Sequence, residues 1–197
     1  MRVLIVVVVF LLSLPSYVAA QSKVTPERVT RNLSGNSIEI PNTRSPDGKF
    51  AIFSVYLDGT TFAVAAIVTT DRKRCLAVTS SLPYGSNVRD RKPKSYLTVL
   101  WSTNSTYVAV HDSARRHSRL EVFACSESGG RQVALPNLFK MMSTKGLIPP
   151  NPRSSGQKPI EWIENKRLVV EVRAKTRSGK KVSKRITLDL EKGTGNN

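Results

Sequence analysis

Cysteine and histidine are scarce in this chain of 197 residues, which contains two of each. There is no Cys-x-x-Cys pair, and neither cysteine has a histidine at metal-ligand spacing, which argues against a metal site. The sequence also lacks a phosphate-binding glycine loop, a paired-carboxylate signature and a serine-hydrolase elbow. We therefore predict no metal and no cofactor, and the sequence names no reaction.

Acidic residues are few as well. The chain has 14 Asp and Glu against 31 Lys and Arg, a formal net charge of +17. Such an excess favours anionic partners: nucleic acid, anionic lipid or lipopolysaccharide, acidic glycans, or an acidic protein surface. The alternative is that the charge only keeps an exported protein soluble.

Long apolar runs are absent after the N-terminus. The run from Val3 to Leu14 follows a basic residue, and small residues precede Gln21, as at a signal-peptidase site. This run is shorter than the roughly 20 residues that a membrane span needs. We predict a signal peptide at residues 1–20, a secreted or periplasmic location and no integral membrane segment after cleavage. An uncleaved N-terminal anchor is the alternative.

A polar turn followed by an apolar strand occupies residues 45–53 and organises the chain. Pro46 suits the second position of a type I turn, and Gly48 tolerates a positive φ at its exit. Two weaker copies of the pattern, 101–110 and 162–170, each begin with tryptophan. The sequence therefore predicts a mainly β fold of three related antiparallel meander units.

The segment from Ser45 to Phe53 resembles the Ser-Pro-Asp-Gly-Lys repeats of bacterial periplasmic β-propeller proteins. The resemblance implies blade-like units and no particular activity, because propellers host many. Ser45 and Ser102 are 57 residues apart and Trp101 and Trp162 are 61 residues apart, whereas a standard blade has about 40–45 residues. A closed ring needs at least about four blades, so we expect a twisted sheet or partial β-propeller.

The remaining segments have simpler predictions. Residues 21–36 are expected to be a flexible lead-in, residues 37–190 a single β-rich domain, and residues 191–197 a disordered tail. One short helix is expected from Gln132 to Gly146, because apolar residues recur there at helical spacing. These residues are Leu135, Leu138, Phe139 and Met142.

The two cysteines, Cys75 and Cys125, lie at or near the third strand of the first and second units. An even number of cysteines in an exported chain favours a disulfide. We therefore name this pair as a disulfide candidate, with two buried free thiols as the alternative.

One cluster could carry catalysis. A base could be supplied by His111 with Asp112, or by His117, and the candidate nucleophiles are Ser102, Ser113 and Ser118. The competing interpretation is a polar hairpin tip, because neighbouring strand residues point to opposite faces.

The C-terminal hairpin is the most specific indication of function in the sequence. Nine basic residues and one acidic residue lie between Lys166 and Arg185. A ribbon with one basic face can follow a phosphate backbone or an acidic glycan. The hairpin has no aromatic residues for base stacking, which weakens the case for nucleic acid. The alternative is that these charges protect an exposed sheet edge. The candidate anion-binding residues are Arg173, Lys175, Lys180, Lys181, Lys184 and Arg185.

These observations favour an exported, non-enzymatic binding or structural module of the cell envelope. It would engage an anionic polymer or an acidic protein through its basic surface. One alternative is a small exported hydrolase that uses His111 and Asp112. Another is an inhibitor or scaffold that binds a protein partner by its sheet edge.

Overall fold

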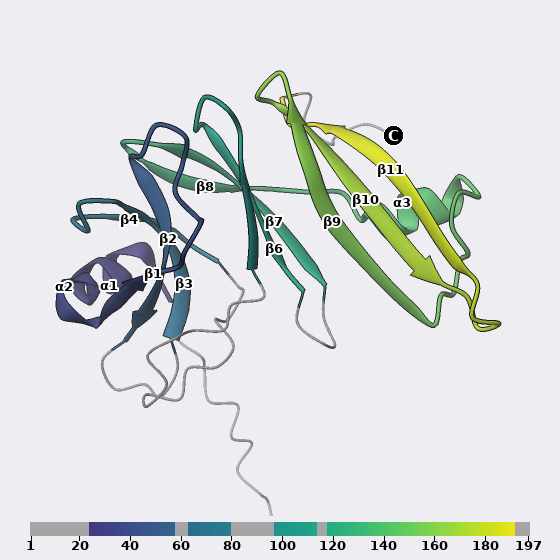
Figure 1. Cartoon of the computed structure of the whole chain (residues 1–197), viewed down its shortest axis with the longest axis horizontal. Helices are drawn as coiled ribbons and strands as arrows, with labels where there is room; N and C mark the ends of the chain where they lie inside the picture. Colours follow the sequence, from purple (N-terminus) through teal and green to yellow (C-terminus); the bar gives the residue numbers. More distant parts are fainter. Residues whose placement is uncertain (1–23, 58–62, 80–96, 114–117, 192–197) are drawn as a thin grey trace, which may run out of the picture.

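The computed structural model describes residues 24–57, 63–79, 97–113 and 118–191. Within them the chain forms three antiparallel sheets that follow one another along the long axis of the molecule (Figure 1). The predicted mainly β, antiparallel class is confirmed. The signal-peptide segment and residues 192–197 of the predicted tail lie outside the described residues.

The first sheet, unit 1, has the strand order β1-β2-β3-β4. Its central strands are buried along almost their whole length because both faces of the sheet are covered. One face packs against the N-terminal helices and the other against the second sheet. The strands are β1 (Ser37–Glu39), β2 (Phe50–Tyr56), β3 (Ala63–Thr69) and β4 (Cys75–Val78).

The second sheet, unit 2, repeats this order with four strands. It packs against unit 1 on one face and contributes to the cluster shared with the third sheet on the other. The strands are β5 (Leu97–Trp101), β6 (Tyr107–Asp112), β7 (Arg119–Ser126) and β8 (Gly129–Val133).

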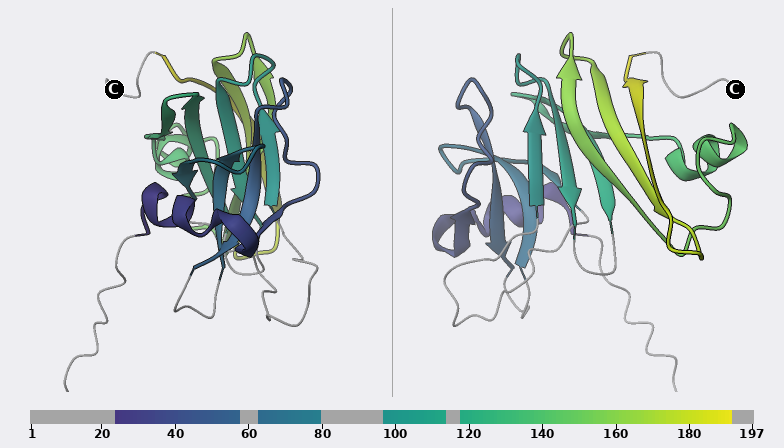
Figure 2. Two further views of the ribbon diagram at one scale, coloured as in Figure 1. Left: turned by 90° about the vertical axis from the view of Figure 1, so that its left-hand side faces the viewer. Right: turned by 45° about the vertical axis from the view of Figure 1, so that its right-hand side comes forward.

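The third sheet, unit 3, has three strands in the described part of the chain. Its strands are longer than those of the other units, as Figure 2 shows. They are β9 (Ser154–Ile163), β10 (Arg167–Lys175) and β11 (Lys181–Asp189). Residues 149–156 are rich in proline, serine and glycine, which is typical of a connector, but part of this segment forms the start of β9.

The predicted flexible lead-in is wrong for residues 26–36. They form two short helices, α1 (Pro26–Arg31) and α2 (Leu33–Asn36), and the hydroxyl of Thr25 caps the first. The apolar side chains of Val29 and Leu33 are buried against unit 1. This burial holds the segment in place, and the few apolar residues among polar neighbours gave too weak a pattern to predict it.

The predicted helix is shorter than expected. Helix α3 (Leu138–Thr144) starts after β8, because residues 129–133 pair with β7 instead of entering the helix. Leu138 and Met142 are buried in a cluster with the apolar residues of β10. No helix in the described ranges is long and apolar enough to cross a membrane.

The first two predicted turns share one hydrogen-bond network. The backbone N–H of the opening serine donates to the carbonyl five residues later, at 2.8 Å in the first turn and 2.9 Å in the second. Its hydroxyl donates to the side-chain oxygen two residues later, at 2.6 and 2.9 Å. The third turn differs, since it is a two-residue turn with positive φ at Glu164 and Asn165. The equivalent residues of the first two turns are Ser45 and Ser102, Asp47 and Asn104, Gly48 and Ser105, and Phe50 and Tyr107.

A repeated tryptophan contact joins successive units. The indole N–H of Trp101 donates to the carbonyl of Thr43 at 2.8 Å, and that of Trp162 donates to the carbonyl of Leu100 at 2.9 Å. Each indole also stacks on an aromatic ring of the preceding unit. The centroids are 6.0 Å apart for Phe50 and Trp101 and 5.8 Å apart for Tyr107 and Trp162. The three units are therefore joined in the same way at both junctions.

The predicted disulfide is wrong, because both cysteines are free thiols. Cys75 belongs to the cluster beneath α1, whereas Cys125 belongs to the cluster between units 1 and 2. These clusters lie on opposite faces of the first sheet, so the two side chains do not point toward each other. Burial raises the pKa of each thiol to about 12.

Candidate anion-binding face on the third unit

The register of unit 3 brings its basic residues together. Residues directly opposite each other in antiparallel strands share one face of the sheet. Lys175 lies opposite Lys181, and Glu171 lies opposite both Arg185 of β11 and Lys158 of β9. We call the resulting cluster the basic face. It consists of Lys158, Arg173, Lys175, Lys181 and Arg185.

Four of the six candidate residues lie on this face, and two do not. Lys184 lies opposite Val172, so its side chain starts from the other face of the sheet. Lys180 lies in the turn that joins β10 and β11. The sequence pattern identified the hairpin but not which residues of β11 share a face with Arg173. In the structure, Lys181 and Arg185 lie on that face and Lys184 lies on the other.

The acidic residue of the hairpin orients Arg173. The guanidinium of Arg173 contacts the carboxylate of Glu171 at 2.5 Å, and the hydroxyl of Ser183 donates to the same carboxylate at 2.6 Å. The bond from Ser183, followed by that from Arg173, holds the pKa of Glu171 below its usual value. Glu171 therefore stays ionised and offsets part of the charge of Arg173, whose side chain remains 61% exposed.

The pair of Lys175 and Lys181 has no such compensation. The two lysines are directly opposed across β10 and β11. Neither makes an ion pair with a carboxylate in the described residues. Like charges in directly opposed positions destabilise a sheet. An anion placed between these two ammonium groups would remove that repulsion.

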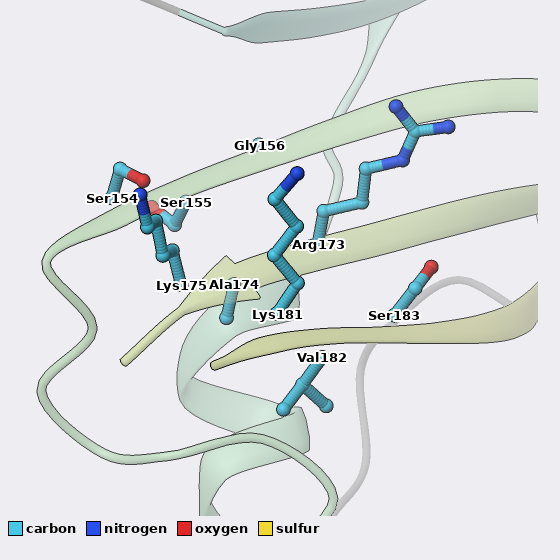
Figure 3. Close-up of a pocket in the computed structure, with 9 residues that line it drawn as sticks. All are labelled: Ser154, Ser155, Gly156, Arg173, Ala174, Lys175, Lys181, Val182 and Ser183. Atoms are coloured by element: carbon cyan, nitrogen blue, oxygen red, sulfur yellow. The ribbon is translucent and has the colours of Figure 1, made fainter. Parts of the chain in front are cut away.

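A groove of about 490 Å³ lies beside this pair. In Figure 3, the side chains of Arg173, Lys181 and Ser183 point to one side of the strands, while those of Ala174 and Val182 point to the other. Ser154 and Ser155 contribute hydroxyl groups, which are further hydrogen-bond donors, to the lining of the same groove. The lining residues are Ser154, Ser155, Gly156, Arg173, Ala174, Lys175, Lys181, Val182 and Ser183.

The second candidate site brings His111 and Ser118 together. Nε2 of His111 lies 3.1 Å from the hydroxyl of Ser118, and His111 is buried. The same hydroxyl donates to the carbonyl of Gln157 at 3.1 Å and accepts from the backbone N–H of Gln157 at 3.0 Å. Ser118 thus ties the start of β7 to β9. His117 lies outside the described residues.

The hydrogen bonds around Ser118 disfavour nucleophilic catalysis. A serine hydroxyl has a single proton, and Ser118 uses it to bond the carbonyl of Gln157. All three contacts coexist only when Nε2 of His111 carries the proton and donates it, which leaves no lone pair there to act as a base. Nδ1 is buried and has no hydrogen-bond partner among the described residues, so no acid in that part of the chain orients the ring. Burial lowers the pKa of His111, which keeps the imidazole neutral.

Of the other nominated nucleophiles, Ser113 is exposed directly after β6, and Ser102 lies at the opposite end of that strand from His111. Ser102 is fully buried in the second turn, where its hydroxyl bonds Asn104. The described residues contain no group of three or more His, Cys, Asp or Glu that could hold a metal ion.

Comparison with known proteins does not indicate a function for this chain. No protein-family model matches the chain, and no curated protein matches it either.

One part of the site was missed from the sequence. Strand β9 supplies Lys158, Gly156 and two serines to the basic face and its groove. The segment from Pro149 to Gly156 is rich in proline, serine and glycine, which favoured a connector. The available indication was the apolar character of β10, because a strand that is buried on both faces usually has a partner strand on each edge.

Proposed function

We propose that this chain is an exported binding module that engages a polyanionic partner through the basic face of unit 3. The observation that carries the proposal is the directly opposed pair of Lys175 and Lys181 beside a groove that also contains Arg173. The export part of the proposal rests on the pattern of residues 1–20.

The geometry supports recognition of several negative charges rather than one. The basic face extends across three strands, from Lys158 on β9 to Lys181 and Arg185 on β11. All three of these residues are exposed. An exposed ion pair contributes about 0.2–1 kcal/mol, so useful affinity requires several contacts at once. Binding of this kind weakens steeply as salt increases, because bound counterions are released when the partner docks.

Heparin, used as a generic sulfated polyanion, tests the proposal on the mature chain. The variant Lys175→Gln with Lys181→Gln removes two charges from the basic face. The matched control, Arg31→Gln with Arg131→Gln, removes two charges from exposed positions on α1 and β8. Two lost contacts lower the affinity about twofold to thirtyfold at 25 °C, so the first variant elutes from a heparin column at lower salt.

The control variant separates site binding from a general effect of net charge. We expect it to elute close to the unaltered protein, well above the face variant. Equal elution of the two variants would mean that charge anywhere on the surface suffices. The basic face would then not be the binding site.

A further inference from the structure

Unit 3 has one strand fewer than its neighbours. Units 1 and 2 each place a fourth strand beside the third, whereas β11 pairs only with β10 in the described part of the chain. The edge strand β11 is nine residues long. A long unpaired edge offers a row of backbone donors and acceptors to another chain.

The hydrogen bonds show which residues form this row. The N–H of Leu190 donates to the carbonyl of Lys166 at 3.1 Å, and the N–H of Thr176 donates to the carbonyl of Lys180 at 2.9 Å. Bonded and non-bonded pairs alternate along an antiparallel ladder. The even-numbered residues of β11 therefore bond β10, and the odd-numbered residues direct their N–H and C=O groups to the open edge. These are Lys181, Ser183, Arg185, Thr187 and Asp189.

The side chains along the edge define what an added strand should carry. Lys181 and Arg185 belong to the basic face, so residues placed beside them would be acidic, because opposite charges in neighbouring strands stabilise pairing. On the other face, Val182 and Ile186 are partly buried against the apolar cluster shared with α3. The complementary strand would therefore alternate acidic and apolar residues.

A second copy of β11 does not meet this requirement. The strand carries Lys181, Lys184 and Arg185 against a single acidic residue, Asp189, so two paired copies would gather an excess of positive charge. Basic residues on an edge strand act against such self-association. The same charges attract an acidic strand.

We propose that the open edge of β11 accepts an extended segment of a partner protein, with alternating acidic and apolar residues, as a fourth strand of unit 3. This inference rests on the proposed function, since it uses the same basic face. It names the partner as an acidic protein segment and the mode of recognition as strand addition.

The test uses a labelled peptide of the same length as β11 that alternates Glu and Val. Its binding to the mature protein is measured by fluorescence anisotropy. A second peptide has the same sequence with N-methyl groups on the backbone nitrogens that would face β11. Strand addition predicts that the methylated peptide loses at least tenfold in affinity, since it cannot donate to the edge.

A protein variant provides the converse measurement. Thr187 is exposed, and its N–H faces the open edge, so Thr187→Pro removes an edge donor while leaving the net charge and the bonds to β10 unchanged. Thr187→Val is the matched control that keeps the N–H. We expect Thr187→Pro to weaken binding of the unmethylated peptide about tenfold, Thr187→Val to bind it normally, and both variants to stay on heparin.

The outcomes distinguish the two proposals. Equal binding of both peptides to the unaltered protein would overturn strand addition, whether or not Thr187→Pro folds. If heparin retention still depended on Lys175 and Lys181 in that case, binding through the basic face would stand without strand addition. If the Lys175→Gln, Lys181→Gln variant bound both the peptide and heparin as tightly as the unaltered protein does, the proposed function itself would be overturned.

Discussion

The tryptophan that joins units 2 and 3 gives a prediction whose size follows from the structure. Trp162→Phe keeps an aromatic ring to stack on Tyr107 but removes the N–H that bonds the carbonyl of Leu100 at 2.9 Å. One such bond contributes about 0.5–1.5 kcal/mol. Trp162 is only partly buried, so water can reach the vacated carbonyl, and we expect a loss of about 1 kcal/mol in the free energy of unfolding.

The assay is thermal unfolding followed by far-ultraviolet circular dichroism, which does not depend on tryptophan fluorescence. For a domain of this size, 1 kcal/mol lowers Tm by about 2–4 °C. Trp162→Ala also removes the stacked ring, and we expect a loss of about 3 kcal/mol, the low end for a large aromatic side chain.

Trp101→Phe is the matched comparison, because Trp101 makes the same contacts one unit earlier. If the two junctions are equivalent, the two phenylalanine variants lose similar stability. A variant at either junction that unfolds at the same temperature as the unaltered protein would refute the repeated junction as a stabilising feature.

Three further predictions concern His111, the close packing of Gly130, and the two cysteines. Burial lowers the pKa of His111 in the folded protein, so the unfolded chain takes up a proton more readily than the folded one. The contribution of His111 to the free energy of unfolding is therefore fully present above about pH 6.5 and is lost as the pH falls below that value. We expect His111→Gln to reduce the pH dependence of the free energy of unfolding, measured by urea titration between pH 7.5 and 5.5. Gly130→Ala would place a Cβ 3.0 Å from a backbone oxygen of β4, and overpacking of this kind costs about 1–3 kcal/mol by chemical denaturation. The thiols of Cys75 and Cys125 should not react with a thiol reagent in the native protein and should both react after denaturation; finding no thiol after denaturation would contradict the structure.

The sequence was a good guide wherever a local pattern determined the structure. The turns at Ser45 and Ser102 were predicted because serine, asparagine and glycine bond their own backbone or tolerate positive φ. Strand β10 overlaps the third copy of the pattern, where Leu168, Val169 and Val170 form a β-branched, apolar run. These features depend on neighbours in the sequence and are therefore visible in it.

Features that depend on distant residues were predicted less well. The helix that contains Val29 is held by burial against unit 1, which no local pattern reveals. The cysteines were paired because of their similar places in the repeat, yet the side chains of Cys75 and Cys125 lie on opposite faces of the first sheet. A one-residue difference in strand phase is enough to separate them.

The candidate site shows both effects. The positive charge of the hairpin is evident from the sequence. In the structure, four of the predicted residues share a face: Arg173, Lys175, Lys181 and Arg185. Lys184 does not, because its place depends on the register of β11 against β10, which in turn depends on the length of the turn between them. The contribution of β9 could not be predicted without knowing that β10 has two partner strands.

The most direct test of the central claim is a map of backbone amide chemical shifts as a short heparin oligosaccharide is added to the isotope-labelled mature protein. We expect little change in units 1 and 2 and the largest changes at Arg173, Lys175, Lys181, Ser183 and Arg185. Changes centred on unit 1 or unit 2, or spread evenly over the exposed lysines and arginines, would contradict this expectation.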